Sequence, residues 1–234
     1  MIQADSIYSK ERLQEGQIIP FNKPADWTSF DVVNKLRRVT GIRKIGHAGT
    51  LDPFATGVLI LCFGKATKRV EHLMVLEKEY RGVIQLGAET DSHDVTGKVI
   101  QETPLTLPLN EDEVESALEQ FRGEIQQVPP MFSALKQNGQ KLYHLARKGK
   151  SIKREPRSVY IKELKMLALQ RDLIEIDVVC SKGTYIRALA RDIGRALGYG
   201  GFLKELVRTR IGFYTIENAL DLSNYEREFK AQAA

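Results

Sequence analysis

A stiff loop that runs directly into a buried strand is the feature that most constrains this chain. Residues 46–59 carry three glycines, which allow tight turns, and Asp52 precedes Pro53, which fixes its own φ and pushes the preceding residue towards extended conformations. Residues 58–63 form a continuous apolar run that Gly64 ends, a pattern typical of a buried central strand. The sequence therefore predicts one carboxylate in a rigid loop that the core anchors at its exit.

A simple structural turn is the alternative for this loop, because an Asp-Pro pair often only begins a turn or caps a helix. The glycines, histidine, threonines, acid and proline gathered here exceed what a turn requires, and they favour a functional site. Two other glycine-rich stretches do not predict nucleotide binding. Residues 41–48 have P-loop glycine spacing without its Lys and Ser/Thr, and residues 198–203 lack the last glycine of a dinucleotide fingerprint and are interpreted as a helix stop.

The composition indicates a protein with a substantial core. Of the 234 residues 42% are hydrophobic, enough for one large domain or two closely joined lobes. The longest apolar runs are too short to cross a bilayer and the N-terminus lacks a signal-peptide pattern, so we expect a soluble, cytoplasmic protein. Cys62 and Cys180 lie in apolar runs and are expected in the core, not in a disulfide. The four histidines lack metal-ligand spacing, so no metal is predicted.

The charge is distributed unevenly along the chain, whose net charge is +5. Residues 136–157 carry eight basic residues against Glu155 alone, and a second basic cluster over residues 35–44 leads into the loop. Residues 101–120, in contrast, hold six acids and no base. Charge runs are often only solvated surface, but two basic clusters near a candidate site fit a polyanion-binding cleft, in which Tyr143 and His144 offer stacking surfaces.

The hydrophobic periodicity predicts helices and strands that intermingle without strict strand–helix alternation. Thr28 begins a capping-box pattern for a helix that Gly41 ends, and Asn110 caps an acidic helix that Gly123 ends. Residues 136–157 are interpreted as a mobile, charged excursion. The order favours an α+β fold on a mixed, largely antiparallel sheet. Further helices are expected over residues 66–76 and 186–197, and strands over residues 18–21, 58–63, 80–86, 159–167 and 173–180.

Seven blocks of this sequence resemble, in the same order, the TruB family of tRNA pseudouridine synthases. The resemblance covers nearly the whole chain, and the loop that holds Asp52 is among its most specific parts. It implies the pseudouridine synthase fold, with a mixed, mostly antiparallel central sheet, flanking helices and a catalytic cleft. The seven blocks are residues 22–29, 46–59, 79–82, 90–94 with 97, 128–134, 180–187, and 206–208 with 212–213.

The resemblance implies isomerisation of a uridine, expected to be uridine 55 in the T loop of tRNA. The enzyme would break the N-glycosidic bond and rejoin the base through C5, without a cofactor. Asp52 matches the catalytic carboxylate, and two routes stay open: covalent attack on the nucleoside, or removal of a ribose proton to give a glycal. The base is buried in the folded T loop, so it must be flipped out, at a cost of a few kcal/mol.

The resemblance also implies roles for residues outside the loop. Arg187 matches the partner of the catalytic acid, whose pKa an adjacent guanidinium would lower. Tyr80 matches the tyrosine that stacks on the target base, and His47 matches the residue that fills the space the base leaves. Lys23 is expected to brace the structure around the site. Two further base-pocket positions match Tyr185 and Leu206.

The basic excursion resembles the family's insertion that closes over the T arm of tRNA. It lies at about residues 124–157 of a single catalytic domain, residues 1–234, and implies binding that weakens with salt. No additional C-terminal RNA-binding domain is expected after Phe213, and we expect a monomer without an obligatory protein partner. The residues expected to contact RNA are Arg43, Lys44, Lys136, Lys141, Arg147, Lys148, Lys150 and Arg154.

One departure from the family pattern and two other hypotheses accompany this prediction. Asp26 stands where family members commonly have glycine, which concerns the local turn and not the loop around Asp52. An RNA-binding or RNA-folding module without chemistry would use the same basic clusters. A carboxylate hydrolase is disfavoured, because no motif positions the second acid that glycosidases usually need.

Overall fold

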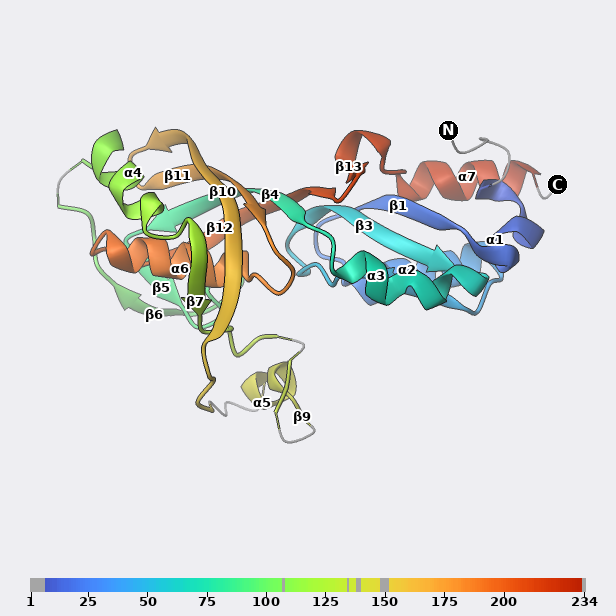
Figure 1. Ribbon diagram of the computed structural model, residues 1–234, viewed down its shortest axis with the longest axis horizontal. Helices are drawn as coiled ribbons and strands as arrows, with labels where there is room; N and C mark the ends of the chain where they lie inside the picture. The colour runs from blue at the N-terminus through green and yellow to red at the C-terminus, as the bar shows by residue number, and fades with distance from the viewer. Residues whose placement is uncertain (1–6, 107, 134, 138–139, 148–151, 233–234) are drawn as a thin grey trace. The chain divides into compact units, whose positions relative to one another are not determined.

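The computed structural model describes residues 7–106, 108–133, 135–137, 140–147 and 152–232 (Figure 1). The chain forms two compact units. The first unit contains the residues up to Tyr80 and those from Leu206 onward, and the second contains Arg81–Glu205. Two strands, β4 (Lys78–Leu86) and β12 (Gly201–Ile211), have residues in both units.

The first unit is built on strand β3 (Thr56–Phe63), the apolar run predicted as a buried strand. Strands β1 (Ile18–Lys23) and β2 (Ile45–Ala48) pair with it antiparallel, and the end of β12 pairs parallel at Val207 opposite Thr56. Alternate β3 side chains enter two different hydrophobic clusters, one on each face of the strand. The prediction of a buried central strand is confirmed, because residues 57–63 are all buried.

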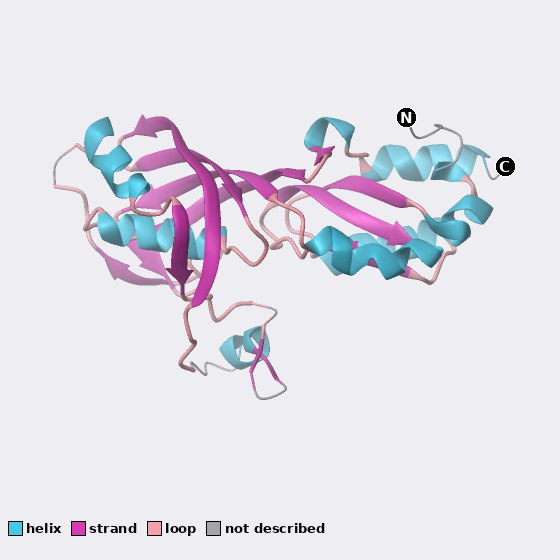
Figure 2. Ribbon diagram, in the orientation of Figure 1, coloured by secondary structure: helices cyan, strands magenta, loops and turns pink. Residues whose placement is uncertain are grey.

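Helices cover this sheet, and β13 (Tyr214–Thr215) extends it beside β12 (Figure 2). Helix α2 (Ser29–Thr40) has the predicted capping box between Thr28 and Asp31 and ends at Gly41, whose φ is +70°. The other helices of this unit are α1 (Lys10–Gly16), the 3₁₀ segments η2 (Gly64–Arg69) and η3 (Ile216–Asn218), α3 (Val70–Met74) and α7 (Leu222–Gln232).

The predicted helix over residues 66–76 is wrong over its first half. The structure places η2 there, and only α3 is α-helical. Gly64 begins the segment at a φ of +53°, and the Thr67 hydroxyl donates to the Gly64 carbonyl at 2.8 Å. This local hydrogen bond stabilises the 3₁₀ turn, which is tighter than an α-helical turn, because a side chain that bonds to nearby backbone competes with the α-helical hydrogen-bond pattern.

The sheet of the second unit has the strand order β12-β4-β11-β10-β7. Strand β10 (Arg157–Gln170) pairs antiparallel with both β11 (Leu173–Cys180) and β7 (Gly123–Gln127). Helices α4 (Glu111–Glu119) and α6 (Ile186–Ala196) pack in this unit, which also has the hairpin of β5 (Ala88–Thr90) and β6 (Val99–Glu102). The prediction of a mixed, mostly antiparallel sheet with helices is confirmed.

Two parts of the second unit depart from the sequence interpretation. Gly198–Leu203 was expected only to stop a helix; α6 does end at Ala196, but β12 begins at Gly201. The basic segment contains regular structure where it is described: β8 (Lys136–Gln137) pairs with β9 (Gln140–Lys141), and α5 (Leu142–Arg147) follows. The intervening turn residues, 138 and 139, lie outside the described residues.

Candidate active site

Asp52 lies in the connection between β2 and β3, where the sequence placed it. Its side chain is half-buried, and its main-chain carbonyl accepts a hydrogen bond of 3.2 Å from the Ala55 amide. The flanking glycines, Gly49 and Gly57, have φ values of +87° and +106°, which favour glycine. The turning ability predicted from composition is therefore used on both sides of Asp52.

A fully buried ammonium group fastens the middle of this loop. Lys23, at the end of β1, is 0% exposed, and its Nζ donates to the carbonyls of Pro24 (2.7 Å), Trp27 (2.6 Å) and Pro53 (3.0 Å). The three N–H donors thus have three acceptors. Burial lowers the pKa of Lys23 to about 8, and the negative charge of Asp52 opposes that shift. These contacts are those of a brace for the loop.

A buried arginine fastens both ends of the loop. Arg208, on β12, is 1% exposed; its Nε donates to the Val58 carbonyl at 2.7 Å, and its Nη1 and Nη2 reach the carbonyls of Thr50 (3.4 Å) and Gly49 (3.1 Å). A Cβ added to Gly57 would lie 2.3 Å from the Arg208 carbonyl oxygen. Arg208 was not predicted as a site residue, and the signal that contained it was the block 206–208 of the family resemblance.

Helix α2 fastens the loop at a third point. The Ser29 Oγ accepts a hydrogen bond of 2.9 Å from the Leu51 amide and donates to the Leu51 carbonyl at 3.3 Å. The preceding turn contains Asp26, whose φ is +63°. Glycine adopts this conformation freely and aspartate tolerates it better than most residues, so the departure from the family pattern leaves the turn in place.

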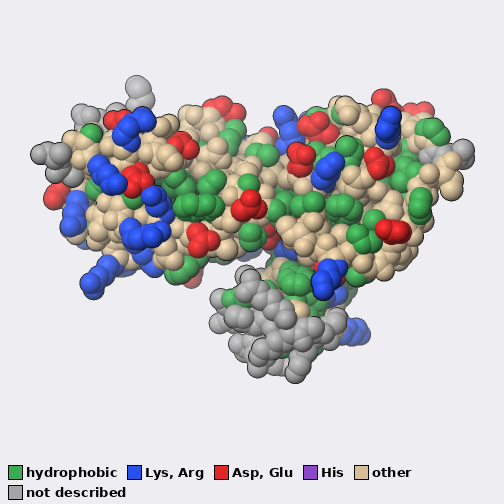
Figure 3. Space-filling model, turned by 180° about the vertical axis from the view of Figure 1, so that it is seen from behind, with side chains coloured by type: hydrophobic (Ala, Val, Ile, Leu, Met, Phe, Trp, Pro, Cys, Tyr) green, Lys and Arg blue, Asp and Glu red, His purple; other side chains and the backbone are tan. Residues whose placement is uncertain are grey.

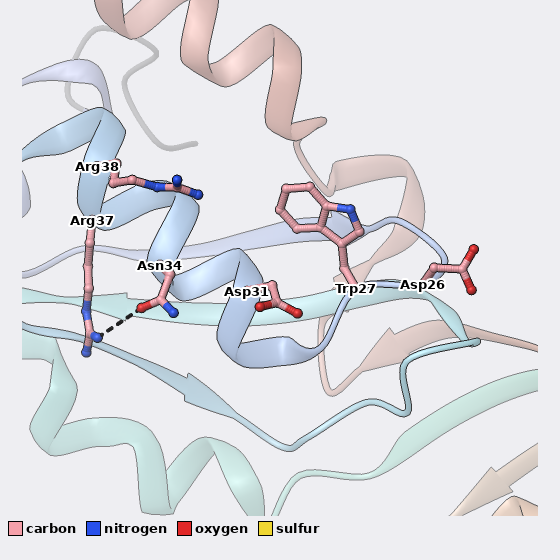
Figure 4. A pocket seen from close by; sticks show the side chains of 6 residues that line it. All are labelled: Asp26, Trp27, Asp31, Asn34, Arg37 and Arg38. Atoms are coloured by element: carbon pink, nitrogen blue, oxygen red, sulfur yellow. Dashed lines mark hydrogen bonds between the residues drawn. The ribbon is translucent and has the colours of Figure 1, made fainter.

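The same helix lines a surface pocket of about 630 Å³ (Figure 4). Arg37 donates to the Asn34 side chain at 3.3 Å, and its guanidinium lies over the ring of Phe30, 5.5 Å from the ring centroid. The predicted catalytic residues are not among those that line this pocket, which are Asp26, Trp27, Asp31, Asn34, Arg37 and Arg38.

Three other predicted site residues share the first unit with Asp52. His47, on β2, is half-buried, and burial followed by the positive charge of Arg208 lowers its pKa. Tyr80, on β4, is 8% exposed, and Leu206, on β12, is 6% exposed. Leu206 directly precedes the residue that pairs with Thr56, so β12 brings it to the strand that leaves the loop. Their roles towards a base stay predictions.

Arg187 lies in the second unit, in the first turn of α6 as predicted. It is 4% exposed, and its Nη1 lies 3.3 Å from the Asp94 carboxylate. Nη1 also donates to the Ser92 carbonyl at 2.9 Å, and Nη2 donates to the Phe132 carbonyl at 2.8 Å. Two chain segments far from α6 therefore fix the orientation of this guanidinium. Its pairing with Asp52 stays a prediction.

Asp94 is a buried carboxylate to which the sequence analysis assigned no role, although it lies in one block of the family resemblance. Its Oδ1 accepts hydrogen bonds from the Ser92 hydroxyl (2.8 Å), the Thr96 amide (3.0 Å) and the Thr96 hydroxyl (2.6 Å). The side chain is 5% exposed, so these donors and Arg187 compensate the burial of its charge. The Ser-x-Asp-x-Thr spacing was the available signal, because short polar side chains form such local networks.

Gln127 is another residue that sequence reasoning missed. It is 1% exposed at the end of β7; its side-chain oxygen accepts from the Tyr185 amide at 2.8 Å, and its Nε2 donates to the Tyr185 carbonyl at 3.1 Å. The amide thus holds the backbone of Tyr185, the N-cap residue of α6, which lies two residues before Arg187.

The predicted RNA contacts divide between the units. Arg43 and Lys44 are exposed just after α2, and Figure 3 shows basic side chains spread over the first unit, which carries the chain termini. Arg154 is half-buried in the second unit. Lys148 and Lys150 lie outside the described residues, as do the side chains of Lys136, Lys141 and Arg147.

Metal and membrane features were searched in the described part of the chain only. It has no group of three or more His, Cys, Asp or Glu side chains that could hold a metal ion, and no helix long and apolar enough to cross a membrane. Cys62 and Cys180 are both buried, as predicted, and burial raises the pKa of Cys62 to about 11.

Known proteins match this chain over most of its length. The model for "TruB family pseudouridylate synthase (N terminal domain)" matches residues 37–186. tRNA pseudouridine synthase B of Francisella philomiragia is 50% identical over 215 residues, which cover 92% of this chain and 71% of that protein. The protein of the same name from Phocaeicola vulgatus is 49% identical over 218 residues, covering 91% and 92%.

Solved structures match the fold. The Cbf5 chain of a Cbf5-Nop10-Gar1 complex has a TM-score of 0.73 at 28% identity, covering 97% of this chain and 59% of that one. An archaeal box H/ACA sRNP Nop10-Cbf5 complex gives a TM-score of 0.70 at 26% identity, covering 95% and 57%. This chain thus spans less than two thirds of those solved chains. From the family model and its relatives, the chain belongs to the TruB family of pseudouridylate synthases.

Proposed function

We propose that this protein isomerises uridine to pseudouridine in the T loop of tRNA, at the position expected to be 55, with Asp52 as the catalytic carboxylate. The observation that carries this proposal is the fastening of the Asp52 loop. Lys23, Arg208 and Ser29 hold it from three different elements through six main-chain groups of residues 49–58. Relatives near 50% identity named tRNA pseudouridine synthase B support the tRNA substrate.

The chemistry asks little of the protein beyond an oriented carboxylate and a cavity for the base. The reaction is an intramolecular exchange, because the N1–C1′ bond breaks, a C5–C1′ bond forms, and the proton on C5 leaves while N1 gains one. No cofactor or co-reactant is consumed. An ionised Asp52 serves as nucleophile or as base towards the ribose, and the rigid loop supplies its orientation in advance. The two routes both remain part of the proposal.

Arg187 is proposed as the cation that pairs with this acid. Its support is the resemblance, together with the way Asp94, Ser92 and Phe132 hold the guanidinium in a fixed direction. A lysine would not reproduce this planar set of donors. Tyr80, Tyr185, Leu206 and His47 are proposed to contact the target base or to fill the space it leaves.

Binding of the T arm is proposed for the two basic clusters. Arg43 and Lys44 are exposed beside the loop's entry strand, and the basic insertion over about residues 124–157 supplies the other cations. Affinity should therefore fall steeply with salt. From the resemblance we also propose that the protein acts in the cytoplasm without an obligatory protein partner.

Mass mapping of a tRNA transcript tests this function. After incubation with the protein, we expect one pseudouridine in the T loop. We expect none in a control transcript in which cytidine replaces that T-loop uridine. Binding with every uridine unchanged would instead favour an RNA-binding module, the second hypothesis that the basic clusters support.

A further inference from the structure

A cavity of about 690 Å³ lies within the second unit, apart from the side chains proposed for catalysis. Its volume is in the range of small-ligand sites. Its lining includes the polar side chains of His93, Arg154 and Arg191 and the apolar side chains of Phe121, Met131 and Phe132. This combination of guanidinium groups, an imidazole and two phenylalanine rings fits a ligand that carries both an anion and a planar ring.

Two buried side-chain nitrogens at this cavity have no hydrogen-bond partner. His93 is 9% exposed, and its Nδ1 is buried without a partner. The Nε of Arg154 is buried and likewise unpartnered. Leaving such groups unsatisfied is costly in a folded protein, so buried unpaired donors that share one cavity point to a ligand that accepts from them.

The charges around the cavity leave one cation available. Arg191 pairs with Asp192 at 2.7 Å, and Arg195 pairs with Glu89 at 2.6 Å. Arg154 makes no ion pair within the described ranges of the chain, although Asp91 also lines the cavity. An anion bound there would therefore gain a free guanidinium without breaking an existing pair.

Four arginines influence the imidazole of His93. Burial, followed by the charges of Arg191, Arg187, Arg154 and Arg195, lowers the pKa of His93 to about 3. The imidazole is consequently neutral near pH 7 and offers one N–H donor. Asp91 and Asp192 line the cavity with His93, and Asp192 is paired with Arg191. Asp94, which follows His93, pairs with Arg187, and Glu89 pairs with Arg195. The guanidinium of Arg154 is therefore the group that an incoming phosphate would meet.

The cavity shares its walls with the anchor of Arg187. The Ser92 carbonyl, which accepts from Arg187, directly precedes His93, and the Phe132 carbonyl, which also accepts from Arg187, belongs to a residue that lines the cavity. A ligand in the cavity thus touches the same two segments that orient this arginine.

We propose that this cavity binds one nucleotide of the RNA other than the reacting uridine, with its phosphate at Arg154 and His93 and its base against Phe121 and Phe132. The inference rests on the proposed function for the identity of the RNA. Guanidinium–phosphate bonds and stacking on aromatic rings are the ordinary means of holding an unpaired nucleotide.

A protein–RNA mutant cycle tests this site. The probe is a T-arm stem-loop RNA and a series in which one loop nucleotide at a time is abasic. Arg154→Gln and Phe121→Ala are compared with Lys165→Gln, which removes an exposed cation on β10 of the same unit. Binding is measured by titration between low and moderate salt, and circular dichroism verifies that each variant is folded.

Arg154→Gln should weaken binding roughly tenfold and reduce the salt slope by about one, whereas Lys165→Gln should change binding less than twofold. For one loop position other than the target, the abasic RNA should bind the wild type several-fold more weakly than the intact RNA does. Phe121→Ala should bind the abasic and the intact RNA equally well. Additive effects at every position, or equal effects of Arg154→Gln and Lys165→Gln, would overturn the proposal.

Pseudouridine formation on the unmodified stem-loop separates this inference from the proposed function. If the wild type forms pseudouridine but no loop position couples to Phe121, the cavity proposal fails and the function stands. If one position couples and no pseudouridine forms, the cavity proposal stands and the function fails.

Discussion

The ammonium group of Lys23 donates a 3.0 Å hydrogen bond to the carbonyl of Pro53, the residue that follows Asp52. Lys23 lies at the end of β1 and Pro53 in the loop between β2 and β3, and the lysine is fully buried. The N–H groups of this buried cation donate to carbonyls close to the candidate catalytic acid, and these hydrogen bonds fix the loop. The ammonium group also places a positive charge near the carboxylate.

Lys23 should make stability depend on pH. Its pKa falls from an ordinary value near 10.5 to about 8 on folding, so between these pH values the unfolded chain binds more protons at this site than the folded one. The free energy of unfolding of the wild type should therefore rise with pH in this interval, relative to Lys23→Met. Urea titrations of both proteins at pH 7.0 and about pH 9.5 measure the difference. A difference that is flat or moves the other way contradicts the account.

Gly57 should tolerate no side chain. Gly57→Ala places a Cβ 2.3 Å from a carbonyl oxygen of β12, so backbone must move, and the cost should be at least about 3 kcal/mol. Gly41→Ala is the matched control, because Gly41 also has a positive φ but its nearest neighbour would be 3.5 Å away, at the end of a flexible lysine. That variant should lose only about 1 kcal/mol. Thermal unfolding compares them, and equal losses would refute the steric argument.

Replacing Asp94 should lower stability and the rate of isomerisation far more than replacing the nearby Asp91. Asp94→Asn removes the buried charge that Arg187 faces, which should cost about 3 kcal/mol of stability and lower the rate of isomerisation. Asp91→Asn alters only an exposed acceptor for the Lys98 amide, 2.9 Å away, and should cost about 1 kcal/mol or less. Urea titration and single-turnover assays report both effects. Similar losses for the two variants would contradict the assigned network.

Asp26→Gly should be neutral or stabilising, by up to about 1 kcal/mol, because glycine adopts a φ of +63° without steric strain. Asp26→Val should destabilise the turn, because a β-branched residue is strained at a positive φ. Thermal unfolding of the two variants should therefore move in opposite directions from the wild type. A gain in stability with valine would show that the turn is not held in this conformation.

Local sequence patterns predicted those parts of the fold that are determined locally. The capping box at Thr28 and Asp31, the buried run of β3 and the start of α6 before Arg187 all depend on residues a few positions apart. Strand β12 was missed because its alternation is interrupted: Arg208 occupies a buried position that a hydrophobic pattern assigns to an apolar residue.

The candidate site was predictable where it depends on residue type and unpredictable where it depends on distant partners. Asp52 was evident from its own loop. Its brace was not, because Arg208 reaches carbonyls 158 and 159 positions away in the sequence. Asp94 and Gln127 were missed for the same reason: each becomes significant only through a partner from another element, Arg187 or Tyr185.

The most direct test of the central claim replaces Asp52 by asparagine, which keeps the side-chain shape and removes the charge. Single-turnover formation of pseudouridine in a T-arm stem-loop should fall below detection for Asp52→Asn, while RNA affinity and thermal stability stay within about twofold and about 1 kcal/mol of the wild type. Asp26→Asn, a matched loss of one carboxylate nearby in the same unit, should retain activity. Turnover by Asp52→Asn at the wild-type rate would contradict the assignment of Asp52 as the catalytic group.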